Sequence, residues 1–213
     1  TSFTPAPEHP PRIGFVMSGQ GPQWWGMGRE LMRTEPVFRD AMERCAAAME
    51  PHARFSLFEE MGRSEAESRL LQTEFAQPAI FARQVGVAEL WRSWGVSPHA
   101  IIGHSVGEVA ASWLAGIFSL EEAARIIVVR AQSMQDCTHG EGGMLAVGMD
   151  ESEATELIAR HDPEVSIAAY NGPRSLTLAG LRTSLEKMAS ELEAREVFVR
   201  FVRVSHPFHH AMM

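Results

Sequence analysis

The chain has 213 residues, of which 45% are hydrophobic and 22% are charged, and its formal net charge is −8. This composition is typical of a globular protein, and an acidic chain without a basic run predicts neither a nucleic-acid partner nor binding to an anionic membrane. Two cysteines without a C-x-x-C pair exclude a disulfide framework and favour a reducing cytoplasm. No apolar run approaches the length of a membrane span.

The first half of the chain predicts strands that alternate with helices. Residues 1–11 hold four prolines and predict a linker, and residues 12–17 are a strand candidate that runs into a glycine-rich turn. Helices are expected at residues 36–50, after the capping-box pair Ser64 and Glu67, from Pro78 to Trp94 with Gly95 as the stop, and from the capping-box pair Ser119 and Glu122 to about Met134. Such alternation predicts a parallel sheet covered by helices.

The run Gly-His-Ser-Val-Gly at residues 103–107 is the strongest chemical signal. It follows a short apolar run and precedes apolar residues with helical spacing at positions 106, 109, 110, 113, 114 and 117. Glycines on both sides of Ser105 allow a tight strand-to-helix turn, which lifts the hydroxyl toward the free N–H groups of a helix N-terminus. This context predicts a nucleophile whose tetrahedral oxyanion such N–H groups stabilise.

The chain has a different pattern after residue 140. Strands are expected at 144–149, 165–170, 175–179 and 197–204, and helices at 150–160 and 181–195. The order β-α-β-β-α-β is typical of a ferredoxin-like unit. We therefore predict a large α/β subdomain over residues 12–140, to which residues 205–213 return, and a small ferredoxin-like subdomain over residues 141–204.

A serine hydroxyl is a weak nucleophile unless a base activates it. Five of the nine histidines lie in polar or loop contexts, at positions 9, 52, 99, 139 and 161. His206, His209 and His210 follow a predicted strand, so they are expected on a strand-end loop, where catalytic groups are often carried. One of these three is the expected base, and their spacing does not choose among them.

Three other residues have both a chemical and a structural interpretation. Arg130 ends an apolar helical run, so it either binds a substrate carboxylate or reaches solvent or a local acid such as Glu121. His104 orients the turn, contacts a ligand, or packs against backbone. Gln20, flanked by glycines, lies either in a loop that approaches a ligand or in a plain turn. The sequence shows no spacing typical of metal ligands or nucleotide binding.

Six short motifs agree in order and spacing with one protein family. They are SGQGPQW at 18–24, QPA at 77–79, GHSVGE at 103–108, Arg130, GGM at 142–144 and PFH at 207–209. In this register the chain resembles the acyltransferase domain of modular type I polyketide synthases, which is related to the malonyl-CoA:acyl-carrier-protein transacylases. The resemblance covers nearly the whole chain after residue 11. It implies an α/β-hydrolase-like large subdomain with a parallel sheet beside the small ferredoxin-like one.

The resemblance also implies the catalytic residues. Ser105 matches the acyl-accepting nucleophile, and His209 matches the general base. The backbone N–H groups of Gln20 and Val106 match the oxyanion hole. The family's fold continues past the position of the last residue here, so we expect this chain to be one domain of a longer polypeptide.

The same resemblance implies the residues that bind substrate. Arg130 matches the arginine that pairs with the free carboxylate of malonyl-type extender units, a bidentate role that lysine would fill poorly. Gln77, His104 and Phe208 match residues that line the acyl pocket. Phe208 and Val106 are typical of malonyl-selecting domains. Selectivity for methylmalonyl or larger units is the alternative, because one methylene is worth only about 1–3 kcal/mol of discrimination.

The implied partners are an acyl-CoA donor of the malonyl type, an acyl carrier protein whose phosphopantetheine thiol accepts the acyl group, and neighbouring domains of a megasynthase. No permanently bound cofactor and no metal are expected, and neither a nucleic acid nor a membrane is an expected partner. The expected location is the cytoplasm.

Two other classes of protein remain as alternatives. A serine esterase or thioesterase uses the same turn and adds an acid between serine and histidine, for which Asp136, Asp150 and Asp162 are formally available. However, Asp150 predicts a helix cap and Asp162 a turn. A non-catalytic docking domain is the other alternative, and it would need neither Ser105 nor His209.

Overall fold

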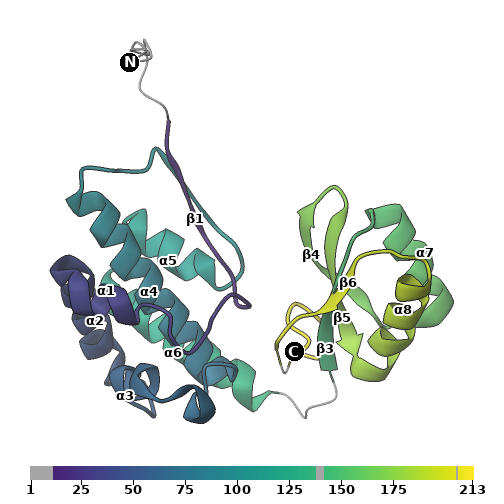
Figure 1. Ribbon diagram of the computed structural model, residues 1–213, viewed down its shortest axis with the longest axis horizontal. Helices are drawn as coiled ribbons and strands as arrows, with labels where there is room; N and C mark the ends of the chain where they lie inside the picture. The colour runs from purple at the N-terminus through teal and green to yellow at the C-terminus, as the bar shows by residue number, and fades with distance from the viewer. Residues whose placement is uncertain (1–11, 138–141, 205) are drawn as a thin grey trace. The chain divides into compact units, whose positions relative to one another are not determined.

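The computed structural model describes residues 12–137, 142–204 and 206–213 (Figure 1). The chain divides into two compact units. The first unit comprises Thr1–Ser68 and Gln77–Val129, and the second comprises Arg69–Ala76 and Arg130–Met213. Within the described ranges, no helix is both long enough and apolar enough to cross a membrane.

The first unit is built around two parallel strands. Strand β1 (Gly14–Met17) pairs in register with β2 (Ala100–Gly103), so that residue 14 lies opposite residue 100 and residue 17 opposite residue 103. Parallel strands need a crossover connection, which here contains α1 (Arg29–Thr34), α2 (Pro36–Met49), α3 (Leu57–Gly62), the short 3₁₀ helix η1 (Glu65–Glu67) and α4 (Thr73–Ser93). Helices α5 (Gly107–Leu114) and α6 (Leu120–Asp136) follow β2.

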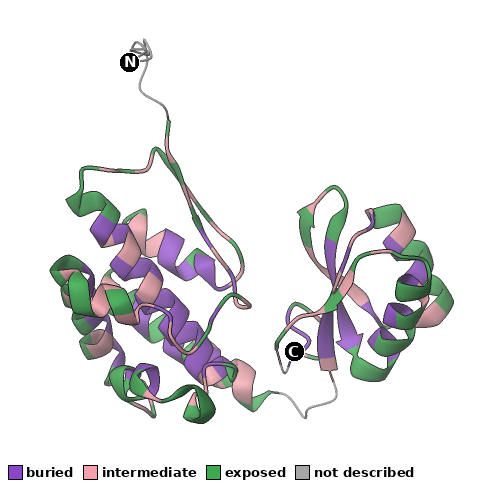
Figure 2. Cartoon of the chain, in the orientation of Figure 1, coloured by how far each residue is buried: buried purple, intermediate pink, exposed green. Residues whose placement is uncertain are grey.

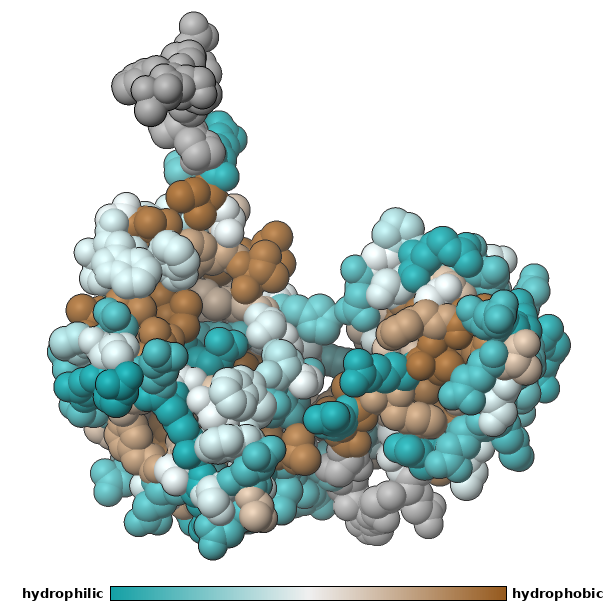
Figure 3. Space-filling view, viewed as in Figure 1, coloured by the Kyte–Doolittle hydropathy of each residue, from teal (hydrophilic) through white to brown (hydrophobic). Residues whose placement is uncertain are grey.

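The apolar core of the first unit is largely helical. Helix α2 buries one face whose residues follow the helical period: Phe38, Ala41, Met42, Cys45 and Met49. Helix α4 approaches this face closely, because a Cβ atom at Gly86 would lie 2.7 Å from the Phe38 ring. Buried residues extend along α4 and α5 (Figure 2). Apolar side chains also reach the surface of this unit (Figure 3), including the paired Val16 and Ile102, which are 71% and 63% exposed.

Apart from the start of α4 and the end of α6, the second unit is a four-stranded antiparallel sheet with two helices. Its elements in chain order are β3 (Gly142–Val147), α7 (Glu151–His161), β4 (Ser166–Gly172), β5 (Ser175–Leu181), α8 (Arg182–Ala194) and β6 (Val199–Phe201). The strand order β4-β5-β3-β6 is the ferredoxin-like topology. Its core is formed by side chains of the strands and of both helices, among them Leu145, Leu157, Leu178, Leu185 and Leu192.

The predicted fold class is confirmed, since a parallel strand pair with helices and a ferredoxin-like unit are both present. The predicted linker at residues 1–11 and the predicted boundary at residues 140–141 lie outside the described residues. The predicted subdomain limits, including the return of residues 205–213 to the large subdomain, stay a prediction. The contacts themselves group residues 130–213 with residues 69–76.

Several predicted element boundaries are wrong. Ser64 and Glu67 bond to each other through their side chains at 2.8 Å, and a 3₁₀ turn rather than a capped α-helix follows. Helix α4 begins at Thr73, so Pro78 lies inside it instead of near its start. The helix after Ser105 ends at Leu114 and does not reach position 117, because Gly116 adopts a left-handed φ of 76°. The short helices α1 and α3 were not predicted individually, although Ser56, three residues before Glu59, is the N-cap of α3 and accepts the Glu59 N–H at 3.3 Å.

Candidate active site

The turn between β2 and α5 holds Ser105 in a left-handed backbone conformation, with φ of 52°. Few residues other than glycine adopt this conformation, and such local strain concentrates at functional sites. Two backbone bonds close the turn: the Gly107 N–H donates to the His104 carbonyl at 3.0 Å, and the Glu108 N–H donates to the Ser105 carbonyl at 3.0 Å. The half-buried serine therefore lies on a strand–turn–helix elbow, as the sequence predicts.

The glycines on either side of the elbow are required by close backbone contacts. A Cβ atom at Gly103 would lie 2.5 Å from the Glu108 nitrogen. A Cβ atom at Gly107 would lie 2.6 Å from the Met17 carbonyl carbon. Both distances are too short for real atoms, so the start of α5 packs directly on the backbone at the end of β1.

The glycine-rich loop after β1 lies beside this elbow, because two parallel strands in register end at the same edge. The His104 N–H donates to the Met17 carbonyl at 2.9 Å and ties the two strand ends together. A Cβ atom at Gly19 would lie 2.7 Å from His104 Nδ1, so only glycine allows this approach. Gly21 has φ of 138°, and its N–H donates to Gln23 Oε1 at 2.7 Å. The structure therefore brings Gln20 and the exposed His104 to the same edge as Ser105.

Two buried glutamines of α4 contact the glycine-rich loop. Gln77, which is 1% exposed, donates from Nε2 to Gln20 Oε1 at 3.2 Å. Gln84, which is 6% exposed, donates from Nε2 to the Ser18 carbonyl at 2.8 Å and to Ser18 Oγ at 3.3 Å. Gln77 was predicted from the sequence as a residue of the acyl pocket, whereas Gln84 was not predicted. The available signal was its position seven residues after Gln77, which places both amides on one face of the helix.

Val106 directly precedes α5 and is buried, with 1% exposure. The first N–H groups of a helix have no partner within the helix, and the aligned peptide dipoles place partial positive charge there. The elbow therefore holds the Ser105 hydroxyl at an end of α5 that favours negative charge. This is the electrostatic requirement for a nucleophile that passes through an oxyanion.

The three candidate base histidines of the second unit differ sharply in their surroundings. His206 is buried, and its ring meets the Phe208 ring edge-on with centroids 5.7 Å apart. His210 uses both ring nitrogens, since Nε2 donates to the Glu164 carbonyl at 2.6 Å and Nδ1 accepts from the Met212 N–H at 3.1 Å. His209 is exposed and has a left-handed φ of 60°. His209 is thus the exposed one of the three, whereas His206 is buried and His210 is half-buried.

Arg130 lies on α6 and is half-buried. Its neighbours Val128 and Ala131 are fully buried, so the guanidinium stem leaves the helix beside the apolar face. Arg130, Phe208 and His209 belong to the second unit, whereas Ser105 and its neighbouring loops belong to the first. Across the described residues, no three histidine, cysteine or acidic side chains are grouped so that they could hold a metal ion.

Asp150 and Asp162, which are among the acids formally available to a hydrolase triad, make local hydrogen bonds. Asp150 caps α7 in a reciprocal pair with Glu153, with bonds of 3.0 and 3.1 Å. Asp162 accepts hydrogen bonds from the Ser184 hydroxyl and from the Glu164 N–H, and these bonds lower the pKa of its carboxyl. Asp136 is the last residue of α6. The cap and turn expected at Asp150 and Asp162 are therefore observed.

Comparison with known proteins identifies the class. The model of the acyl transferase domain family matches residues 14–213. The loading acyltransferase from the avermectin modular polyketide synthase superposes with a TM-score of 0.85 at 37% identity, covering 92% of this chain and 62% of that chain. The malonyl CoA-acyl carrier protein transacylase from Clostridium perfringens superposes with a TM-score of 0.81 at 30% identity, covering 95% and 64%. The chain belongs to the acyl transferase domain family.

Its curated relatives narrow the class to acyltransferase domains of modular polyketide synthases, which confirms the resemblance found in the sequence. The chain is 40% identical over 200 residues to the polyketide synthase GfsB of Streptomyces halstedii. It is 38% identical over 208 residues to the erythronolide synthase EryA2 of Saccharopolyspora erythraea. These matches cover 94% and 98% of this chain but only 4% and 6% of the two synthases.

Proposed function

We propose that this chain moves a malonyl-type acyl group from CoA to the phosphopantetheine thiol of an acyl carrier protein through an acyl-serine intermediate. The observation that carries the proposal is the strained Ser105 elbow at the start of α5, beside the glycine-rich loop. Membership of the acyl transferase family supports acyl transfer as the reaction class. The similarity to a malonyl CoA-acyl carrier protein transacylase supports the donor and the acceptor.

In the first half-reaction His209 takes the proton of the Ser105 hydroxyl, and the oxygen attacks the thioester carbonyl. The N–H groups of Gln20 and Val106 bind the tetrahedral oxyanion. The carbon–sulfur bond then breaks, and His209 returns the proton to the departing CoA thiolate. In the second half-reaction the carrier thiol attacks the acyl-serine ester, with the same proton transfers in reverse order. No resident cofactor takes part.

Arg130 supplies selectivity by pairing with the free carboxylate of the extender unit. A guanidinium offers two parallel N–H donors to a carboxylate, so malonyl-type donors are preferred over acetyl. Phe208 narrows the pocket at the α-carbon and favours malonyl over substituted malonyl groups. This second preference is the weaker of the two, because a single methylene contributes about 1–3 kcal/mol.

Intact-mass measurement after mixing the chain with a panel of acyl-CoAs tests the proposal. The chain should gain one malonyl group from malonyl-CoA, and Ser105→Ala should gain none, whereas the matched control Ser112→Ala on α5 should acylate normally. Acylation of Ser105→Ala at the wild-type rate would refute the nucleophile. His209→Ala should slow acylation by about 10²–10⁴-fold, whereas His210→Ala should not.

The substrate role of Arg130 has its own test. Arg130→Ala should lower malonyl transfer by about 10–100-fold, as expected for the loss of hydrogen bonds to a charged group, while acetyl transfer stays unchanged. Equal losses with both donors would refute the carboxylate contact. Release of free malonate faster than transfer to the carrier would identify a hydrolase instead.

A further inference from the structure

We propose that Gln84 is a positioning residue that holds the oxyanion-binding N–H of Gln20 through the Ser18 carbonyl. The inference rests on the proposed function, because it assigns Gln84 to the same oxyanion hole. Gln84 acts on the glycine-rich loop from helix α4, through the Ser18 backbone, and not on Ser105 or the acyl group directly.

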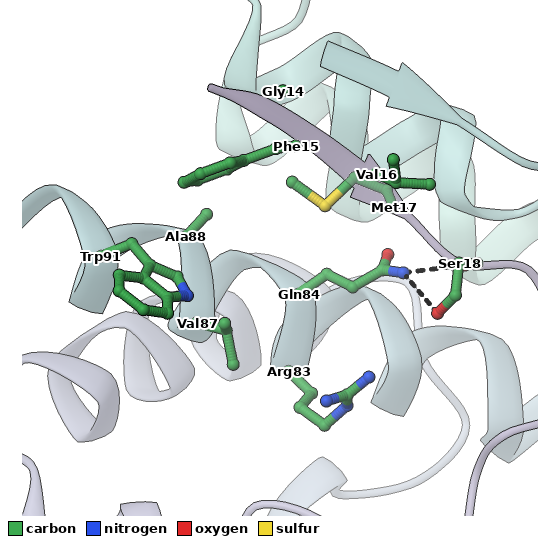
Figure 4. A pocket seen from close by; sticks show the side chains of 10 residues that line it. All are labelled: Gly14, Phe15, Val16, Met17, Ser18, Arg83, Gln84, Val87, Ala88 and Trp91. Atoms are coloured by element: carbon green, nitrogen blue, oxygen red, sulfur yellow. Dashed lines mark hydrogen bonds between the residues drawn. The ribbon is translucent and has the colours of Figure 1, made fainter. Parts of the chain in front are cut away.

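The Gln84 amide is buried where an apolar side chain would be expected. It lines a cavity of about 300 Å³ between β1 and α4, together with Val87 and Ala88 (Figure 4). Its Nε2 donates to the Ser18 carbonyl and hydroxyl, while its Oε1 is buried and accepts no hydrogen bond from the described residues. Because a carbonyl only accepts, the contact with the Ser18 carbonyl fixes which end of the amide points to the loop. An amide whose nitrogen is bonded while its buried oxygen is not is unfavourable for packing alone, so a functional role is expected for it.

The Ser18 carbonyl that Gln84 holds also faces the first turn of α5. A Cβ atom at Gly107 would lie 2.8 Å from this oxygen. The preceding Met17 carbonyl accepts the N–H of His104, which is adjacent to the nucleophile. The backbone at the end of β1 is therefore held by the Ser105 elbow on one side and by Gln84 on the other.

The other buried glutamine of α4, Gln77, holds the opposite end of the segment from Ser18 to Gln20. Gln77 lies two helical turns before Gln84 and bonds to the Gln20 side chain at 3.2 Å. Between the two anchors lies Gly19, whose backbone would otherwise rotate freely. The peptide unit that joins Gly19 to Gln20 carries the Gln20 N–H. Anchors on both sides of this unit fix the direction of that N–H before substrate binds, which is the preorganisation that an oxyanion hole needs.

Gln84→Met is the variant that tests this role, because it keeps the length of the side chain and removes the donor. Pre-steady-state acylation of Ser105 should slow by about 10–100-fold, the size of effect that misplacement of a catalytic group by about 1 Å produces. The KM for malonyl-CoA should change by less than about twofold, because the oxyanion forms only in the transition state. The matched control is Thr177→Val in the second unit, which also removes a buried hydrogen-bonding group and should not change the acylation rate.

A fluorophosphonate probe separates this inference from the proposed function, because it phosphonylates an activated serine whatever the natural acyl donor. Gln84→Met should label about 10–100-fold more slowly than the wild-type chain. If malonyl-CoA fails to acylate the wild-type chain but the probe labels Gln84→Met slowly, the proposed donor is wrong and the Gln84 role stands. Three outcomes would each overturn the role of Gln84. They are labelling and acylation of Gln84→Met at the wild-type rate, a change confined to the KM for malonyl-CoA, and an equal loss of rate in Thr177→Val. Failure of the probe to label the wild-type chain would overturn both proposals.

Discussion

The first unit pairs residue 14 with residue 100 across a long helical crossover, whereas the second unit pairs all four of its strands within residues 142–201. The difference appears in burial. Strand β5 of the second unit buries five consecutive residues, but Val16 and Ile102 of the first sheet remain exposed. The second unit therefore rests on a sheet and helix core of its own, while the first rests mainly on helices packed beside a short, partly exposed strand pair. The strand pair of the first unit serves to bring two loops together.

A cavity made in the core of the second unit is the strongest test of whether each unit has a separate core. Leu178→Ala should lower the free energy of unfolding of the second unit by about 2–5 kcal/mol, because Leu178 is fully buried among other apolar side chains. Ile102→Ala should change stability by less than about 0.5 kcal/mol, because that side chain is exposed.

Urea unfolding resolves the two units, since every tryptophan lies in the first: Trp24, Trp25, Trp91, Trp94 and Trp113. Leu178→Ala should leave the tryptophan fluorescence transition in place and weaken hydrogen-exchange protection only in residues 142–201. A parallel shift of the fluorescence transition would show that the two units unfold as one, and the comparison would fail.

A smaller effect is expected at the elbow of the first unit. Gly107→Ala should destabilise the first unit by about 1–3 kcal/mol, because its Cβ atom would overlap the Met17 backbone. The same change should slow acylation of Ser105 by at least about 10-fold, because it moves the nucleophile relative to the loop. Gly62→Ala is the matched control, since a Cβ atom there meets nothing within 4 Å. Stability is read from the tryptophan transition, and full activity of Gly107→Ala would contradict the proposed packing.

Helix caps should produce the next smaller effects, one in each unit. Ser119 and Glu122 form reciprocal bonds of 2.8 and 3.1 Å before α6, as Asp150 and Glu153 do before α7. Ser119→Ala and Asp150→Ala should each lower the free energy of unfolding by about 0.5–2 kcal/mol. Hydrogen exchange should show the first loss in α6 and the second in α7. Loss of protection in α2 from Asp150→Ala, or in α8 from Ser119→Ala, would argue against independent unfolding of the two units.

The two cysteines offer the mildest test. Burial raises the pKa of the Cys45 thiol to about 12, while Cys137 is exposed. Because an unfolded thiol ionises near pH 8.5, the first unit should lose stability as the pH rises from about 9 toward 12, by at most about 1.4 kcal/mol per pH unit. At pH 8, iodoacetamide should modify Cys137 rapidly and Cys45 only when the first unit opens. Peptide mass spectrometry measures the rate at which each cysteine is modified. Equal rates for Cys45 and Cys137 would contradict the burial of Cys45.

The sequence predicted elements that local residues specify better than features that depend on contacts between distant residues. The order of the expected strands and helices, with a helix cap at Asp150, identified the ferredoxin-like unit, because each of its elements is specified within a few residues. The capping-box pattern at Ser64 and Glu67 predicted an α-helix where the structure has only the 3₁₀ helix η1, since the two side chains bond to each other and make no cap hydrogen bond to the backbone. Pro78 was expected near a helix start but lies within α4, where surrounding packing outweighs its local preference.

The sequence by itself determined that Ser105 lies on a strand-to-helix elbow, because glycines at both sides and a helical apolar period are local features. It also determined the family, through short motifs that recur in register. Only the tertiary structure decided how His206, His209 and His210 differ, because burial and partners such as the distant Glu164 carbonyl are not encoded in their spacing. It alone also revealed Gln84 behind the Ser18 carbonyl, since that contact joins residues 66 positions apart.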